Sequence, residues 1–355
     1  MRSLRIGFAG TAKNTGKTTT LSALMDSFLE DGWRLGLTSI GYDGENLDNV
    51  TGLPKPRIYV QPGVLVATST RCVEASSAKL RLVRETDINT SLGPVIIGKV
   101  EEPGLVVLAG PSYSKGLESV LLLFEEEGVR VSFIDGAFGR IAPMNVADGL
   151  VLCTGAARDR RVSVIAEEAR GVERILKLNS WSGSPDAVLP QGSLIGEYPD
   201  EGLLPVRLPP RGAVLVEGAV SPAALNLFLS SHRELLDGGT VVFENPVSLI
   251  AGGAAAENER LIRQFHSVKF CVLKRLELFG VTVNPFYPER GRVEGTFEAR
   301  YIDAVKLLDV FRRNLETLVL DVKREGIGAL YQQVLAYLRN WEPQACRQLY
   351  RKCTS

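Results

Sequence analysis

The chain has 355 residues, of which 45% are hydrophobic and 23% are charged, and its 41 basic side chains balance its 41 acidic ones. This length allows either one large α/β domain or a domain with an appendage. The zero net charge removes the simplest electrostatic argument for binding nucleic acid or an anionic membrane, so neither is an expected partner.

The five cysteines are scattered without a Cys-x-x-Cys pair, and the chain has only two histidines. Both observations favour a reduced cytoplasm over a disulfide framework or a zinc site. No apolar run approaches the roughly 18 residues that span a bilayer. The N-terminus enters a strand-like run rather than a signal sequence. We therefore expect a cytoplasmic protein.

Short β-rich runs alternate with amphipathic stretches, which predicts an α/β fold with a largely parallel central sheet flanked by helices. The expected strands are Leu4–Ala9, Arg34–Ile40, Gly63–Thr68, Leu105–Ala109, Val129–Ile134, Gly149–Cys153, Ala213–Val216, Thr240–Phe243 and Val281–Val283. The expected helices are Lys17–Asp31, Ser114–Glu127, Arg160–Leu178, Pro222–Leu236 and Ala254–His266. After Pro288 the pattern becomes helical. We expect a nucleotide-binding α/β domain over residues 1–288 and a helical C-terminal appendage over residues 289–355.

The most informative segment follows the first strand. Residues Gly10–Thr18 read Gly-Thr-Ala-Lys-Asn-Thr-Gly-Lys-Thr, and a helical pattern follows them until Gly32. In a phosphate-binding loop of this kind, backbone N–H groups converge on phosphate oxygens, the lysine reaches the β- and γ-phosphates, and the next hydroxyl holds Mg²⁺. The sequence therefore predicts a P-loop NTPase that binds ATP and Mg²⁺.

The loop departs from the usual GxxxxGK[ST] string in one respect. Gly10 lies one position too early, and Thr11 stands where the first glycine is expected, which favours a subclass with a longer loop. The residues expected to contact the nucleotide are Gly10, Thr11, Lys13, Asn14, Thr15, Gly16, Lys17, Thr18 and Thr19.

A metal-dependent nucleotide site also needs carboxylates. Asp135 closes the apolar strand that begins at Val131, and at the carboxyl end of a parallel strand it would lie beside the phosphate loop. Asp43 follows the second strand in a glycine-containing loop and is the candidate for a metal ligand or a water-positioning group. Thr18, Asp135 and Asp43 are the expected metal contacts, and Lys17, Asp43 and Asp135 are the expected catalytic residues. The alternatives are turn roles for both aspartates.

Other candidates are less specific. Arg140 either reaches developing phosphate charge or lies on the surface. Glu217 ends another strand, and the segment Lys55-Pro-Arg57 either binds an anion or leads into a strand. No NKxD string signals guanine, and Asn245 or Asn284 could accept an adenine amino group.

The chain resembles a known family. Its longer loop is similar to that of the dethiobiotin synthetase and cobyrinic acid synthase branch of P-loop proteins. A closer resemblance is to the reactivase subunit that accompanies the cobalamin-dependent lysine 5,6-aminomutase. The matching strings are Ala12-Lys-Asn-Thr-Gly-Lys-Thr-Thr-Thr, Leu37-Thr-Ser-Ile-Gly-Tyr-Asp-Gly-Glu, Lys55-Pro-Arg-Ile-Tyr-Val, Ala109-Gly-Pro-Ser, Ile134-Asp-Gly-Ala and Val283-Asn-Pro. The helical tail lies outside the resemblance.

This resemblance implies an ATPase that works with a second, MutS-like ATPase subunit to restore an aminomutase whose adenosylcobalamin is damaged. It also implies a homodimer. Lys17 and Thr18 carry over as phosphate and Mg²⁺ contacts, Asp135 as the strand-end acid and Asp43 as the loop acid. Phe138-Gly139 before Arg140 departs from the family pattern.

Two other functions stay open. One is an ATP-dependent, carboxylate-activating ligase or amidotransferase-like enzyme of the dethiobiotin synthetase type, although no Cys/His pair has a spacing typical of glutamine hydrolysis. The other is a nucleotide-binding regulatory module that does not hydrolyse its ligand.

Overall fold

The computed structural model describes residues 2–41, 57–137, 141–196, 208–251, 254–290 and 297–353. Within these residues, the main sheet contains nine strands. Their order is β18 (Val319–Leu320), β15 (Glu277–Asn284), β9 (Gly149–Gly155), β1 (Leu4–Gly10), β8 (Val131–Ala137), β2 (Leu35–Ser39), β4 (Leu65–Ser69), β6 (Gly93–Glu102) and β5 (Lys79–Thr90). The pairs from β18 to β4 are parallel, and β6 and β5 extend the sheet in antiparallel fashion. This confirms the predicted mixed α/β fold with a large, largely parallel central sheet.

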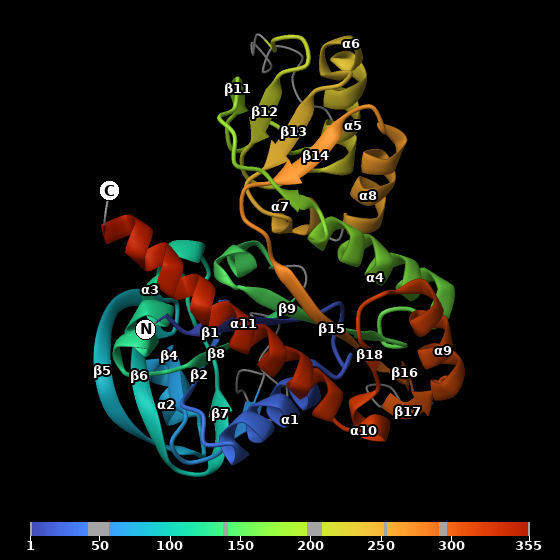
Figure 1. Cartoon of the computed structure of the whole chain (residues 1–355). Coiled ribbons are helices and arrows are strands. Elements are labelled where there is room, and N and C mark those ends of the chain that lie inside the picture. The colour runs from blue at the N-terminus through green and yellow to red at the C-terminus, as the bar shows by residue number, and fades with distance from the viewer. Residues whose placement is uncertain are drawn as a thin grey trace.

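Helices cover both faces of the main sheet (Figure 1). On one face lie α1 (Lys17–Glu30) and the C-terminal helix α11 (Gly328–Cys353). On the other lie α3 (Ser114–Glu126) and α4 (Val162–Leu176). Strand β1 is buried on both faces because α1 and α11 cover Leu4, Ile6 and Phe8 while Ala9 packs on the opposite side.

Helix α1 forms because its apolar residues recur at helical spacing. Leu21, Leu24, Met25 and Phe28 are fully buried against the sheet. The helix ends as predicted before Gly32, whose φ of 77° lies in the left-handed region that glycine adopts without strain.

A second sheet of five parallel strands lies above the main sheet in Figure 1. It contains β10 (Asn179–Ser180), β14 (Lys269–Val272), β13 (Thr240–Phe243), β12 (Ala213–Val216) and β11 (Ala187–Leu189), with helices α5 (Pro222–Ser231), α6 (Arg233–Leu236), α7 (Val247–Ile250) and α8 (Ala255–Gln264). The predicted strands Ala213–Val216 and Thr240–Phe243 are confirmed, but they belong to this sheet and not to the central one.

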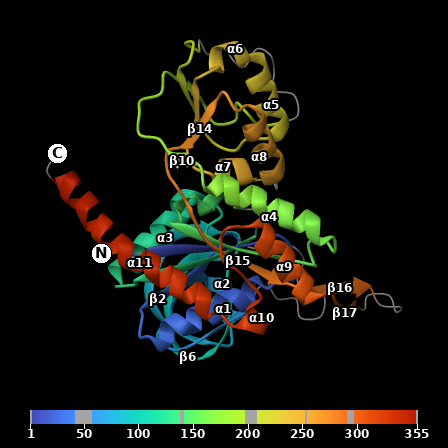
Figure 2. The same ribbon diagram turned by 45° about the vertical axis from the view of Figure 1, so that its right-hand side comes forward.

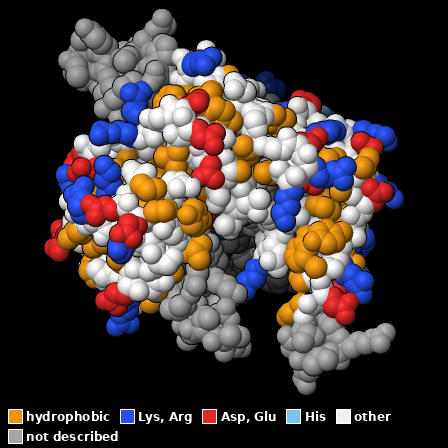
Figure 3. All heavy atoms as spheres, turned by 90° about the horizontal axis from the view of Figure 1, so that it is seen from below, with side chains coloured by type: hydrophobic (Ala, Val, Ile, Leu, Met, Phe, Trp, Pro, Cys, Tyr) orange, Lys and Arg blue, Asp and Glu red, His pale blue; other side chains and the backbone are white. Residues whose placement is uncertain are grey.

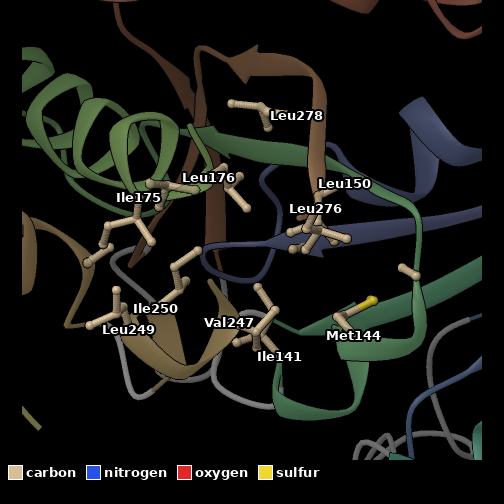
Figure 4. Close-up of a cluster of buried hydrophobic side chains, with 14 of the residues drawn as sticks. Ile141, Met144, Leu150, Ile175, Leu176, Val247, Leu249, Ile250, Leu276 and Leu278 are labelled. Atoms are coloured by element: carbon tan, nitrogen blue, oxygen red, sulfur yellow. The ribbon is translucent and has the colours of Figure 1, made fainter. Parts of the chain in front are cut away.

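The two sheets join through a buried apolar cluster. It contains residues of α4, α7, β9, β15 and the short 3₁₀ helix η2 (Ala142–Val146), including Met144, Leu150, Ile175 and Ile250 (Figure 4). The chain passes from β14 directly into β15, so the second sheet is attached near the amino end of β15.

The remaining elements are short. They are α2 (Thr70–Glu74), the antiparallel pair β3 (Arg57–Val60) and β7 (Gly104–Val107), the antiparallel pair β16 (Phe286–Arg290) and β17 (Phe297–Tyr301), α9 (Ala304–Asn314) and α10 (Val322–Glu325). The segment expected to be a helical appendage does contain α9, α10 and α11. It also contains β17 and β18, and β18 extends the main sheet beside β15. Strand β18 has only two residues, which is too short to show a periodic pattern, so the sequence could not predict that this segment adds a strand to the main sheet. No helix in the described part of the chain is long and apolar enough to cross a membrane.

The C-terminal helix is anchored on α1. The rings of Tyr331 and Phe28 meet edge to face with centroids 4.8 Å apart, and the Tyr331 hydroxyl donates a hydrogen bond to Asp31. Burial, followed by this hydrogen bond, raises the pKa of Tyr331 to about 12. Helix α11 is therefore part of the folded core.

We expect Leu338→Ala to lower the free energy of unfolding by about 2–4 kcal/mol, because Leu338 is buried between α11 and the sheet. Gln332→Ala is the matched control, since Gln332 is exposed on the same helix, and it should change stability by less than about 0.5 kcal/mol. Urea unfolding followed by circular dichroism measures both. Equal effects would show that α11 does not pack as described.

Candidate functional site

The parallel pairing of β1 places the following loop between two neighbouring strands. Gly10, the last residue of β1, pairs with Ala137 of β8 on one side and with Cys153 of β9 on the other. The carboxyl ends of these three strands therefore meet at one edge of the sheet, where ligands bind in open α/β sheets.

The loop between β1 and α1, residues 11–16, has a tightly determined backbone. Asn14 and Gly16 both have a positive φ, of 64° and 85°. A Cβ atom on Gly10 would lie 3.1 Å from Thr15 Oγ1, which itself donates to the Ala12 carbonyl at 2.9 Å. Gly16 caps α1 without a side-chain hydrogen bond, and the first turn holds no acidic residue. The first-turn N–H groups, which have no partner within a helix, thus face a position that suits an anion.

Neighbouring strands hold the loop from the side of β9 and β15. The Thr11 backbone N–H donates to the Cys153 carbonyl at 3.0 Å, and the Thr11 hydroxyl donates to Thr154 Oγ1 at 2.9 Å. Asn284, at the end of β15, donates from Nδ2 to the Asn14 carbonyl at 2.8 Å. Gly155 has room only for a hydrogen, since a Cβ there would lie 2.0 Å from the Asn284 carbonyl oxygen.

The central ion pair of the site joins the loop helix to β8. Lys17 Nζ lies 2.8 Å from Asp135 Oδ1, and the two side chains are 16% and 3% exposed. No hydrogen bond of good geometry reaches Asp135 Oδ1 within the described residues, so the Lys17 ammonium is its charge partner. A buried carboxylate held in this way can exchange its partner for a metal cation, which would release the lysine toward an anion.

On the other side of Asp135, the end of β2 meets the segment after β7. Ile40 donates its N–H to the Asp135 carbonyl at 2.8 Å, and Gly41 donates to the Pro111 carbonyl at 2.9 Å. The Ser39 hydroxyl accepts from the Gly110 N–H at 3.0 Å. A Cβ on Gly110 would lie 2.0 Å from the Ser39 carbonyl oxygen, so this contact requires glycine.

The structure thus brings together most of the residues that the sequence identified. Gly10, Thr11, Asn14, Thr15, Gly16, Lys17 and Asp135 lie at one edge of the main sheet. Thr18 is half-buried at the start of α1, while the side chains of Lys13 and Thr19 are exposed. Asp43, Lys55 and Arg140 lie outside the described residues. Among the described residues, no three His, Cys, Asp or Glu side chains gather as a metal site of their own.

Glu217 and Asn245 do not belong to this site. They follow β12 and β13 of the second sheet, where Asn245 accepts a hydrogen bond from the Val247 N–H at 3.0 Å. The eight residues of β15 separate that sheet from Asn284, a span of roughly 25 Å at the usual strand rise. The sequence could not distinguish Glu217 and Asn245 from the residues at the β1–α1 loop, because a polar residue at the end of any strand has the same local pattern.

The supporting contacts of Thr154 and the Cys153 carbonyl have no signal in the sequence. A resemblance string contains Asn284, but the sequence suggested only base recognition for it, whereas the structure shows it against the loop backbone. Cys153, the β9 residue whose carbonyl holds Thr11, is fully buried. Burial raises the pKa of its thiol to about 11, although Thr282 and Thr20 contact the sulfur and act in the opposite direction.

The face seen in Figure 3 mixes hydrophobic, basic and acidic side chains and is hollowed near its centre.

Neither a protein-family model, nor a curated protein, nor a solved structure matches the chain. A functional assignment therefore depends on the geometry of the site and on the sequence strings that form it.

We expect Cys153 to resist alkylation in the native protein, because a thiol with a pKa of about 11 is only about one-thousandth thiolate at pH 8 and is fully buried. Iodoacetamide labelling followed by peptide mass spectrometry measures this, with the urea-unfolded chain as the control. If Cys153 were labelled as fast in the native protein as in the unfolded chain, it could not be buried beneath the loop.

Proposed function

We propose that this chain is a P-loop NTPase that binds ATP with Mg²⁺ and hydrolyses it to reactivate a cobalamin-dependent aminomutase. The observation that carries the nucleotide part is the Lys17–Asp135 ion pair at the end of β1 and β8. A lysine at the start of a helix and an acid at the end of the adjacent strand are the two charges that a metal–phosphate ligand requires.

The loop fits a phosphate. Lys17 supplies a positive charge, and the first-turn N–H groups of α1 supply donors at the positive end of the helix dipole. The positive φ values at Asn14 and Gly16 turn the backbone around the position where a phosphate would lie. The bonds from the Thr11 N–H to the Cys153 carbonyl and from Asn284 to the Asn14 carbonyl fix this backbone, so little ordering is needed on binding.

The site also fits a hard cation. Asp135 Oδ1 is buried, and among the described residues its charged partner is Lys17. Thr18 is next to Lys17 on the same helix turn. Asp135 and Thr18 would hold Mg²⁺, and Asp43 is the proposed loop acid. Bound Mg²⁺ supplies charge neutralisation at the β- and γ-phosphates. The chain's own contribution is to move the Lys17 ammonium from Asp135 to the phosphates, which keeps the buried carboxylate paired throughout.

The reactivase assignment is supported by the resemblance and by where its strings lie. The strings that contain Asp135 and Asn284 are distant in sequence and both contact the β1–α1 segment. The strings that contain Gly41 and Gly110 meet each other on the other side of Asp135. The proposed partners are the aminomutase, a second MutS-like ATPase subunit and a second copy of this chain.

We expect Lys17→Ala to weaken ATP binding by about tenfold or more, because a charge-assisted contact contributes roughly 1.5–3 kcal/mol. Isothermal titration calorimetry with MgATP measures this, and Lys115→Ala, an exposed lysine in the first turn of α3, is the matched control. Because Lys17→Ala leaves Asp135 without its charge partner, the double variant Lys17→Ala/Asp135→Asn separates a loss of binding from a loss of stability. Unchanged affinity in a folded Lys17→Ala protein would exclude the phosphate role.

We expect Asp135→Asn to weaken the binding of MgATP much more than the binding of ATP in EDTA, because the amide is a poor Mg²⁺ ligand but preserves the shape of the side chain. Calorimetry with and without Mg²⁺ measures the ratio of the two affinities. An equal effect under both conditions would assign Asp135 to lysine positioning alone.

Turnover distinguishes the reactivase from the other functions. ATP hydrolysis that increases with a damaged aminomutase and its ATPase partner, and that disappears in Lys17→Ala, is the expected result. Turnover that depends instead on a small carboxylate would indicate a ligase of the dethiobiotin synthetase type. Binding without turnover under any condition would indicate a regulatory module.

A further inference from the structure

The hairpin formed by β16 and β17 projects from the body of the protein near α9 (Figure 2). Within the described residues it is a sheet of two strands only. All five residues of β17 are exposed, and Phe297 and Tyr301 expose 66% and 65% of their surface. A strand edge of this kind is a template for pairing with another chain.

The register of the hairpin decides which backbone groups face outward. Ile302 donates its N–H to the Pro285 carbonyl at 3.0 Å, next to the pair formed by Phe286 and Tyr301. Hydrogen-bonded and non-hydrogen-bonded pairs alternate in an antiparallel ladder. The N–H and C=O groups of Phe297, Ala299 and Tyr301 therefore point away from β16.

The two outer edges of the hairpin differ. Pro288 is opposite Ala299 and occupies an outward-facing position on β16, so that edge lacks a donor at its centre. Strand β17, with the sequence Phe-Glu-Ala-Arg-Tyr, contains neither proline nor lysine. Of the two outer edges, only that of β16 therefore lacks a backbone donor at its centre.

We propose that β17 pairs in antiparallel fashion with β17 of a second copy of this chain, centred on Ala299. In this register each Phe297 is opposite Tyr301 of the second copy, and each Glu298 is opposite Arg300. The outward-facing groups of Phe297, Ala299 and Tyr301 then bond to one another across a two-fold axis, as an isologous interface requires.

The side chains are self-complementary on both faces of this four-stranded sheet. Phe297 and Tyr301 form aromatic cross-strand pairs on one face, where Phe286 already packs on Tyr301 with ring centroids 5.7 Å apart. On the other face Arg300 contacts Glu298 at 2.8 Å and Glu289 at 3.1 Å, and pairing extends this network across the axis. If β17 paired with a strand of a different protein, its aromatic and charged residues would not need to be arranged symmetrically about Ala299.

A five-residue strand pair buries less than the roughly 1,200 Å² of most stable complexes, so the dimer should depend on concentration. Sedimentation velocity of the full chain over a range of concentrations, without nucleotide, measures it. The result therefore does not depend on the proposed ATP binding.

We expect Ala299→Pro to weaken dimerisation by about tenfold or more, because it removes the central outward donor while sparing the bonds to β16. Ala299→Ser, which retains the N–H, is the matched control. Circular dichroism checks that each variant folds.

Charge reversal tests the register directly and does not depend on proline. Glu298→Arg and Arg300→Glu each place like charges opposite one another in the dimer, and each should weaken it by about tenfold. The double variant Glu298→Arg/Arg300→Glu restores opposite charges and should restore the dimer. A monomeric wild-type protein at about 100 µM, or a dimer that tolerates Ala299→Pro and both single reversals, would overturn the proposal.

Discussion

Strand β1 is hydrogen-bonded between β8 and β9, and this parallel arrangement determines where each group of the candidate site lies. Because parallel strands end at the same edge, the β1–α1 loop emerges beside Asp135 and beside the Thr154 hydroxyl. The ion pair between Lys17 and Asp135 then joins two segments that are more than 100 residues apart in the sequence. The buried carboxylate needs a positive partner, so the lysine and any metal ion compete for the same position.

The loop is held from the side of β9 and β15 by contacts that do not involve this ion pair. Asn284 of β15 and the Cys153 carbonyl of β9 bind its backbone, and the Thr154 hydroxyl accepts from the Thr11 hydroxyl. Gly41 and Gly110 meet on the far side of Asp135. The second sheet is attached at the opposite end of β15 and supplies none of these contacts. The candidate phosphate site and the second sheet are therefore separated by the length of one strand.

The sequence predicted the elements whose pattern is local. The apolar spacing of Leu21, Leu24 and Phe28 defines α1, and an acid directly after an apolar strand identified Asp135. It could not show that Ala213–Val216 belongs to a second sheet, because pairing depends on distant chain segments. It also missed the long hairpin β5–β6, although the alternation of Leu80 and Leu82 with charged residues is typical of a half-exposed strand. The role of Asn284 required the fold, because its partner lies 270 positions away.

The central claim is that the backbone N–H groups of the β1–α1 loop and the first turn of α1 hold a phosphate. Hydrogen–deuterium exchange of the full chain, with and without MgATP, tests it most directly. The account predicts slower exchange for the amides of residues 11–19, and no change in β12 and β13 of the second sheet. Unchanged exchange in the loop at saturating MgATP, or protection confined to the second sheet, would contradict it.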